Sequence, residues 1–268
     1  MEGSQLRWAG IRYRARTTRL RLPLVWIRHR GINPRDVFLA SYPRSGNTWL
    51  RFILYELITG ESGDFKRVDQ FIPYVGRHHR APDVLPGGGR LLKTHEHYRN
   101  EYKKAIYLLR DPRDVLVSNY FFFTNPTAPG TSIREFTLRF LDGKINAFGR
   151  WERHLQSWLE SPLQRAKGIT VIRYEDLIRR PNDAIVRLLE FLGRQTSLDE
   201  VRRALRNNRF ENMRDKEKMD PHYAGVISER GRVVRQGHMN GWRDFLSDGE
   251  LKLVERQYGQ LLREFGYS

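Results

Sequence analysis

The segment Ser41-Tyr42-Pro43-Arg44-Ser45-Gly46-Asn47-Thr48-Trp49 has the residue types of an anion-binding turn. It follows a short apolar run and precedes an apolar pattern with helical spacing. A strand, a tight turn and a helix in this order direct unpaired N–H groups and the positive helix end at the turn. Arg44 adds a cation, while Ser45 and Thr48 add hydroxyls. The segment therefore predicts a phosphate or sulfate site, against the alternative of an ordinary connection with a capping serine.

The turn differs from the phosphate loop of nucleoside triphosphatases. The spacing G-x-x-x-x-G-K-[ST] is absent, because nothing supplies the first glycine or the lysine. Trp49 also places a large flat side chain beside the predicted anion, where it can stack on a base. A nucleotide is therefore favoured over a bare anion.

Polar clusters end three further apolar runs of the chain. They are Lys93-Thr94-His95, Arg110-Asp111-Pro112-Arg113-Asp114 and Arg173-Tyr174-Glu175-Asp176. In parallel sheets, ligands bind beyond the carboxyl ends of the strands. The clusters are therefore expected to converge on one site with several cations, a histidine and a tyrosine. Taken singly, each residue also has a structural explanation, and Glu175 and Asp176 are interpreted as structural acids.

Short strands alternate with amphipathic helices, which predicts an α/β fold of three layers. A central, mostly parallel sheet is flanked by helices and carries a P-loop-like strand-turn-helix. The expected strands are Val37–Ser41, Leu91–Thr94, Ala105–Leu109 and Ile169–Tyr174. The expected helices are Thr48–Thr59, Arg113–Phe123, Ile133–Leu141, Gly149–Leu159, Asn182–Leu192, Leu198–Asn207 and Gly249–Phe265. The segments 60–90 and 209–241 are expected to be long loops that act as lids or binding loops.

The chain is strongly basic. Its 268 residues include 48 Lys+Arg and 31 Asp+Glu, a net charge of +17. This charge attracts phosphates, acidic glycans and anionic membranes. Cysteine is absent, which excludes disulfides and thiolate chemistry. Neither a transmembrane span nor a convincing secretory signal is found, so a cytoplasmic location is expected.

The chain is expected to divide into a basic arm, residues 1–35, and a single domain, residues 36–268. The first 30 residues hold eight arginines and one acid, Glu2. Such an arm is typical of an organelle transit peptide, a solvated basic tail or an arm at a membrane surface, and a solvated or surface-associated arm is favoured, with peripheral association with an anionic membrane as the partner it suggests. It also raises the alternative of nucleic-acid binding, but no RNA-binding signature, helix-turn-helix or zinc pattern is present. No specific nucleic acid is therefore expected as a partner.

The clusters, in their order, resemble the P-loop-type sulfotransferases of the cytosolic type. The resemblance rests on the turn Ser41–Trp49, Lys93–His95, and Arg110–Asp114 with Ser118. Further matches are Tyr174-Glu175-Asp176-Leu177, Phe210, and Arg235-Gln236-Gly237 through Trp242. Order and spacing agree over about residues 36–265. Six separated matches in order make the resemblance specific.

The resemblance implies transfer of a sulfuryl group from 3′-phosphoadenosine 5′-phosphosulfate (PAPS) to an acceptor hydroxyl or amine. His95 falls on the general base, and Lys93 on a side chain that contacts the transferred group. Arg44 stands at a catalytic cation where many members have lysine. The other positions imply nucleotide contacts: the 5′-phosphosulfate at Ser45, Gly46, Asn47 and Thr48; the 3′-phosphate at Arg110, Ser118, Arg235, Gln236 and Gly237; and the adenine at Trp49, Tyr174 and Phe210.

Physical chemistry supports these roles. Guanidinium groups suit bidentate contact with phosphate oxygens. Fixed cations and amides stabilise the charge that develops in sulfuryl transfer, and a neutral imidazole takes a proton near neutral pH. No metal is required, and the histidines His78, His79, His95 and His97 lack the partner spacing of a metal site.

Some positions depart from the family pattern. Arg44 and Gln236 each replace a frequent lysine, and Asn240-Gly241 replaces a usual Gly-Asp. The acceptor stays open among small molecules, lipids and glycans, because its pocket is expected to come from loops. The alternative function is a catalytically inactive nucleotide- or polyanion-binding module of the same fold.

Overall fold

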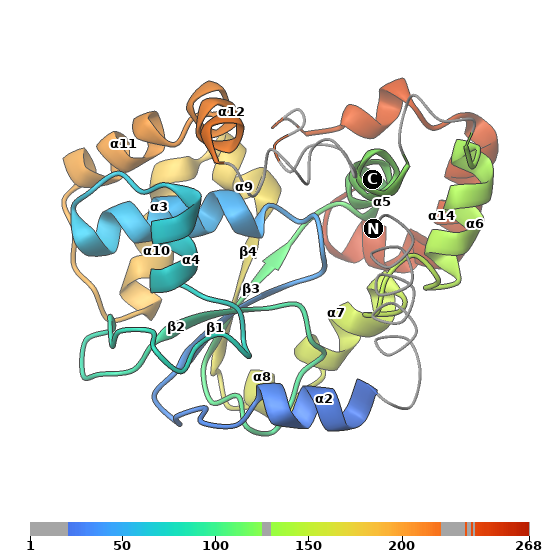
Figure 1. Ribbon diagram of the computed structural model, residues 1–268. Coiled ribbons are helices and arrows are strands. Elements are labelled where there is room, and N and C mark those ends of the chain that lie inside the picture. The colour runs from blue at the N-terminus through green and yellow to red at the C-terminus, as the bar shows by residue number, and fades with distance from the viewer. Residues whose placement is uncertain (1–20, 125–129, 221–233, 235–236, 238, 268) are drawn as a thin grey trace, which may run out of the picture.

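The computed structural model describes residues 21–124, 130–220, 234, 237 and 239–267 (Figure 1). Within them a parallel sheet holds strands in the order β2-β1-β3-β4. The strands are β1 (Val37–Ser41), β2 (Leu91–Thr94), β3 (Ala105–Leu109) and β4 (Ile169–Arg173). β1 and β3 are central and wholly buried, which explains their continuous apolar sequences. Because all four strands run the same way, their polar ends meet at one edge.

Helices cover both faces of the sheet (Figure 1). One core packs the sheet against α3 (Asn47–Thr59), α4 (Phe65–Phe71), α10 (Pro181–Phe191) and α11 (Leu198–Asn207). The other core packs it against α5 (Pro112–Phe123), α6 (Ile133–Leu141), α7 (Trp151–Leu159) and α14 (Asp248–Glu264). Neighbouring residues of β1 alternate between the cores: Leu39 faces the first and Ala40 the second. The predicted three-layer α/β fold is therefore confirmed.

The shorter elements correct some details of the prediction. They are α8 (Pro162–Arg165), α9 (Tyr174–Arg179), α12 (Phe210–Met219) and the 3-10 helix η1 (Gly241–Asp244). Tyr174 begins α9 instead of ending β4. The segment expected as a loop before β2 contains α4, whose first turn Asp64 caps by accepting from the Arg67 N–H at 2.7 Å. The later loop begins with α12, which buries Met213.

Helix α2 (Arg21–Arg28) lies within the segment predicted as a basic arm. Val25 is buried, and Arg28 Nη2 donates to the Val75 carbonyl at 2.9 Å. Nε2 of the buried His29 lies 2.6 Å from the Tyr102 hydroxyl. This part of the predicted arm therefore packs on the domain, while residues 1–20 lie outside the described residues. The domain boundary at residue 35 stays a prediction.

Candidate active site

The turn after β1 is shaped to receive an anion. Arg44 and Gly46 both adopt left-handed backbone, with φ of 73° and 95°. The first helical bond of α3 runs from the Leu50 N–H to the Gly46 carbonyl, so the three preceding amides have no partner within the helix. Ser45 Oγ is buried and has no hydrogen-bond partner among the described residues. These unpaired amides and the unpaired hydroxyl need hydrogen-bond acceptors, and the oxygens of a bound phosphate or sulfate would supply them.

The Asn47 side chain has a structural contact that the sequence did not reveal. Its Nδ2 donates to the Leu39 carbonyl and to Ser41 Oγ, each at 3.1 Å. Both acceptors belong to β1, so this amide ties the start of α3 to the strand below it. A contact from Asn47 to the nucleotide would then come from its backbone N–H, and that role stays a prediction.

Arg44, Arg110 and Ser118 lie together at the ends of β1, β3 and the first turns of α5. Arg44 Nε donates to Ser118 Oγ at 3.1 Å, and its guanidinium lies 4.6 Å from the Phe122 ring centroid. Arg110 Nη1 donates to the Arg44 carbonyl at 3.2 Å. The fold therefore brings the predicted cations and the predicted serine into one cluster.

Two of the three predicted adenine residues, Trp49 and Tyr174, contact each other. Trp49 and Tyr174 meet edge to face with ring centroids 5.8 Å apart. Trp49 Nε1 donates to the Asn208 carbonyl at 2.7 Å, while the Arg110 guanidinium lies 4.3 Å from the Tyr174 ring. Gly237 approaches Phe210 so closely that an added Cβ would lie 2.5 Å from that ring. Arg235 and Gln236 lie outside the described residues.

Asp114 anchors the segment that follows Gly237. Its carboxylate accepts from the Asn240 and Trp242 backbone N–H groups, each at 3.0 Å. Asn240 adopts left-handed backbone with φ of 59°, a conformation that asparagine tolerates better than most residues. The unusual Asn240-Gly241 pair is therefore accommodated by a left-handed turn at the start of η1.

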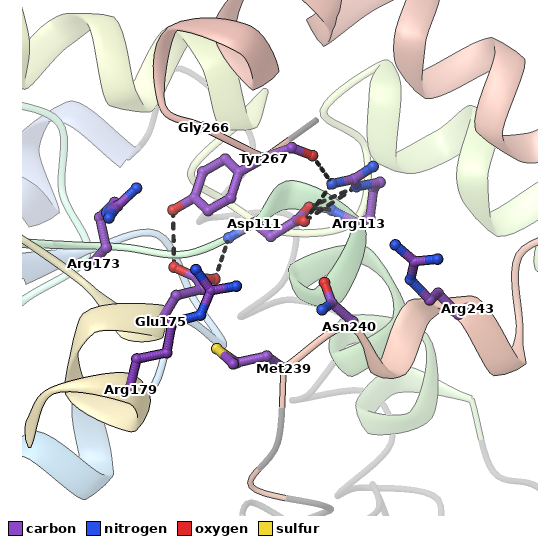
Figure 2. Close-up of a pocket in the computed structure, with 10 residues that line it drawn as sticks. All are labelled: Asp111, Arg113, Arg173, Glu175, Arg179, Met239, Asn240, Arg243, Gly266 and Tyr267. Atoms are coloured by element: carbon purple, nitrogen blue, oxygen red, sulfur yellow. Dashed lines mark hydrogen bonds and ion pairs between the residues drawn. The ribbon is translucent and has the colours of Figure 1, made fainter.

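A separate cavity of about 190 Å³ has Asp111, Arg113, Glu175 and Tyr267 among its lining residues (Figure 2). In it Asp111 pairs with Arg113 at 2.7 Å, and Glu175 accepts from the Asp111 N–H at 3.1 Å. The Tyr267 hydroxyl also donates to Glu175 at 3.1 Å. Burial raises the pKa of Glu175. These contacts connect the start of α5, α9 and Tyr267. They fit the interpretation of Glu175 as a structural acid.

His95 stands at the end of β2 with one ring nitrogen fixed. Its Nδ1 lies 2.7 Å from the Ser41 carbonyl oxygen, which can only accept. Nδ1 therefore carries the proton, and in the neutral ring Nε2 holds the lone pair. The Tyr74 and Phe148 rings lie at 5.7 Å from the imidazole. In the neutral ring Nε2 is thus the nitrogen that can accept a proton.

Burial, followed by the neighbouring Lys93 charge, holds the pKa of His95 well below its usual 6.5. The imidazole is therefore neutral near physiological pH. Burial also holds the pKa of Lys93 well below its usual 10.5. Lys93 Nζ lies 4.2 Å from the Tyr74 ring centroid, where a cation is stabilised by the ring face.

The backbone of His95 is held by a second histidine. Nε2 of the fully buried His154 lies 3.0 Å from the His95 carbonyl, and its Nδ1 lies 2.9 Å from the Tyr107 hydroxyl. Tyr107 belongs to β3 and His154 to α7. Sequence reasoning missed these residues, together with Tyr74 and Phe148, because none of them follows a strand end in a polar cluster.

Comparison with known proteins places this geometry in a family. The sequence model of the sulfotransferase domain matches residues 34–266. Human sulfotransferase 2A1 is 27% identical over 258 residues, covering 87% of each chain. Mouse sulfotransferase 1A1 is 28% identical over 255 residues, covering 85% of each chain. This chain belongs to the sulfotransferase family.

Solved structures show the same fold. Mouse sulfotransferase SULT7A1, complexed with PAP, has a TM-score of 0.66 at 23% identity, covering 87% of this chain and 85% of its own. Retinol dehydratase, in complex with androsterone and the inactive cofactor PAP, has a TM-score of 0.69 at 20% identity, covering 88% and 83%. Fold and family define an enzyme of the sulfotransferase class that uses PAPS.

The described residues lack the features of two other classes of site. No group of three or more histidine, aspartate or glutamate side chains there could hold a metal ion. No helix there is long and apolar enough to cross a membrane.

Proposed function

We propose that this chain transfers the sulfuryl group of PAPS to an acceptor hydroxyl or amine, with His95 as the general base. The observation that carries the proposal is the bond from His95 Nδ1 to the Ser41 carbonyl, which turns Nε2 into the proton acceptor. The orphaned hydroxyl of Ser45 beside the amides of α3 supports binding of the phosphosulfate.

The nucleotide is proposed to lie across the strand ends. Ser45, Gly46, Asn47 and Thr48 hold its 5′-phosphosulfate. The 3′-phosphate is held by two groups of residues. These are Arg110 and Ser118 near the end of β3, and Arg235, Gln236 and Gly237 later in the chain. The adenine contacts Trp49, Tyr174 and Phe210, whose rings offer apolar faces for stacking.

PAPS supplies an activated sulfuryl group whose leaving group is a phosphate. The acceptor oxygen forms a bond to sulfur, while the bond between sulfur and the phosphate oxygen breaks and leaves its electron pair on that phosphate. Nε2 of His95 takes the acceptor proton. Arg44 and Lys93 supply cationic side chains that stabilise the charge on the transferred group and on the departing phosphate.

A radiolabelled-donor assay tests this proposal. Labelled PAPS is incubated with phenols, lipids, oligosaccharides and peptides, and binding of adenosine 3′,5′-bisphosphate is measured by calorimetry. We expect saturable nucleotide binding and labelled product from at least one acceptor class. Nucleotide binding without any labelled product favours the inactive binding module. Absence of nucleotide binding overturns both functions.

We also propose a cytoplasmic location with peripheral attachment to anionic membranes through the basic N-terminal segment. Helix α2 supports this, because Leu24, Trp26 and Ile27 are 44%, 59% and 52% exposed. Arg30 lies 5.0 Å from the Trp26 ring. Exposed apolar side chains beside arginines suit the interface of an anionic bilayer, and tryptophan favours that depth.

Vesicle co-sedimentation tests the attachment. The chain is expected to bind phosphatidylcholine vesicles that contain phosphatidylserine, and to be released by salt. Trp26→Ser/Ile27→Ser should weaken binding about tenfold, because two apolar side chains no longer enter the bilayer. Leu138→Ser/Leu198→Ser removes exposed leucines from other helices and should leave binding unchanged. Equal binding to vesicles without phosphatidylserine contradicts the electrostatic part of the proposal.

A further inference from the structure

An open groove of about 840 Å³ lies along α4 and the segment that follows it. Its lining includes the aromatic side chains Tyr55, Phe65, Phe71 and Tyr74. Tyr55 and Phe71 meet edge to face at 5.2 Å, which fixes part of this wall. A groove with several aromatic side chains suits a ligand with a flat apolar body.

Tyr74 connects the groove to the proposed transfer site. It lines the groove, yet its ring lies 4.2 Å from Lys93 Nζ and 5.7 Å from the His95 ring. An isolated parallel β-bridge between the backbones of Tyr74 and Lys93 holds Tyr74 at this position. Tyr74 is therefore a residue that the groove and the surroundings of His95 share.

The rim of the groove is cationic. Lys66, Arg67, Arg77 and Arg80 line it, against the acids Asp69 and Asp220. Asp69 is engaged elsewhere, because it pairs with the buried Arg51 at 2.6 Å. Arg67 lies near two exposed acids, Glu61 and Asp64, at 3.6 and 3.8 Å.

Arg77 and Arg80 differ from Arg67 in their surroundings. Both side chains are exposed, and neither forms an ion pair with another of the described residues. They follow Tyr74 by three and six positions on the same segment. A ligand anion at this rim would therefore meet two cations that are in no ion pair with another described residue, which favours its binding.

We propose that this groove binds the acceptor, and that the acceptor is an amphipathic anion. Its flat apolar body lies against Phe71 and Tyr74, and its carboxylate, sulfate or phosphate group lies at Arg77 and Arg80. Its hydroxyl or amine reaches Nε2 of His95. The assignment of this ligand as acceptor rests on the proposed function, whereas the preference of the groove for an anion does not.

Two fluorescent probes test the groove without any turnover. Anilinonaphthalene sulfonate is a flat anion, and N-phenylnaphthylamine has the same ring system without the charge. Arg77→Ala/Arg80→Ala should weaken binding of the sulfonate about tenfold and leave the neutral probe within twofold, because only the anion loses its cations. Arg139→Ala/Arg153→Ala removes two exposed charges from helices α6 and α7 and should change neither affinity. Unchanged sulfonate binding in Arg77→Ala/Arg80→Ala, or an equal loss for both probes, overturns the proposal.

Turnover then separates this inference from the proposed function. Hydroxyphenylpropionate and its methyl ester are compared as acceptors with labelled PAPS. Arg77→Ala/Arg80→Ala should raise KM for the acid at least about fivefold, with kcat and the KM of the ester unchanged, because the charges bind and do not react. Equal KM values for acid and ester in the wild type contradict the acceptor class. Absence of product from every acceptor, with anion-selective probe binding intact, overturns the proposed function and leaves the groove as a binding site.

Discussion

Replacement of His95 by asparagine is expected to lower kcat for sulfuryl transfer by about 10³-fold, within the range that removal of a general base produces. The asparagine amide can still donate to the Ser41 carbonyl, which His95 Nδ1 contacts at 2.7 Å, so the end of β2 keeps its bond. It has no group that takes a proton near neutral pH. Affinity for adenosine 3′,5′-bisphosphate, measured by calorimetry, should stay within about twofold of the wild type, because His95 is not among the residues proposed to contact the nucleotide.

The exposed His79 provides a matched control for this variant. His79→Asn makes the same chemical change outside the proposed site and should leave kcat unchanged. Retained turnover in His95→Asn would remove His95 from the role of base. A loss of nucleotide affinity equal to the loss of kcat would instead indicate that the variant disturbs the turn after β1.

The pH dependence of kcat offers an independent readout of the same residue. Because burial and Lys93 hold the pKa of His95 well below 6.5, the imidazole stays neutral as the pH falls through 6.5. Protonation, which abolishes the base, then occurs only at lower pH. The acidic limb of kcat is therefore expected below pH 6.5, and the His95→Asn variant should lack that limb. An acidic limb at or above 6.5 contradicts a His95 that is neutral at that pH.

The strands were predictable because each is a buried apolar run that ends in polar residues. Helix α4 was missed although its sequence carried a signal: Phe65, Val68 and Phe71 recur at helical spacing after the capping Asp64. Helix α12 carried a weaker signal in its sequence, because FENMRDKEKM is mostly charged. The helix is held by the burial of a few side chains, among them Met213. Local pattern therefore predicts elements with an apolar face and misses those that packing stabilises.

The residues of the candidate site also fall into those that local sequence predicts and those that it does not. Parallel strands bring their ends together, so the convergence of Lys93, His95 and Arg110 followed from chain order. Tyr74 and His154 reach His95 from a segment before β2 and from α7, and no local pattern marks those contacts. Such residues act through packing and hydrogen bonds that only the folded chain brings together.

Replacement of Gly46 by alanine is expected to weaken binding of adenosine 3′,5′-bisphosphate by about 30-fold or more, and to lower the free energy of unfolding by about 1–3 kcal/mol. Gly46 has φ of 95°, where a side chain is strained, and a Cβ there would lie 2.6 Å from the Tyr174 ring. Tyr174 cannot move aside easily, because Trp49 and the Arg110 guanidinium pack against it. The added methyl group must therefore displace the turn or the aromatic rings predicted to bind adenine.

Gly60 provides the control that separates strain from collision. It has φ of 78°, and an added Cβ would have no atom within 4 Å. Gly60→Ala therefore carries the left-handed strain at the far end of α3 without the clash. Calorimetry should show wild-type nucleotide affinity for Gly60→Ala together with a modest loss of thermal stability. If Gly46→Ala binds the nucleotide as tightly as Gly60→Ala, the close approach of Tyr174 to the turn has no part in nucleotide recognition, and the proposed position of the phosphosulfate is wrong.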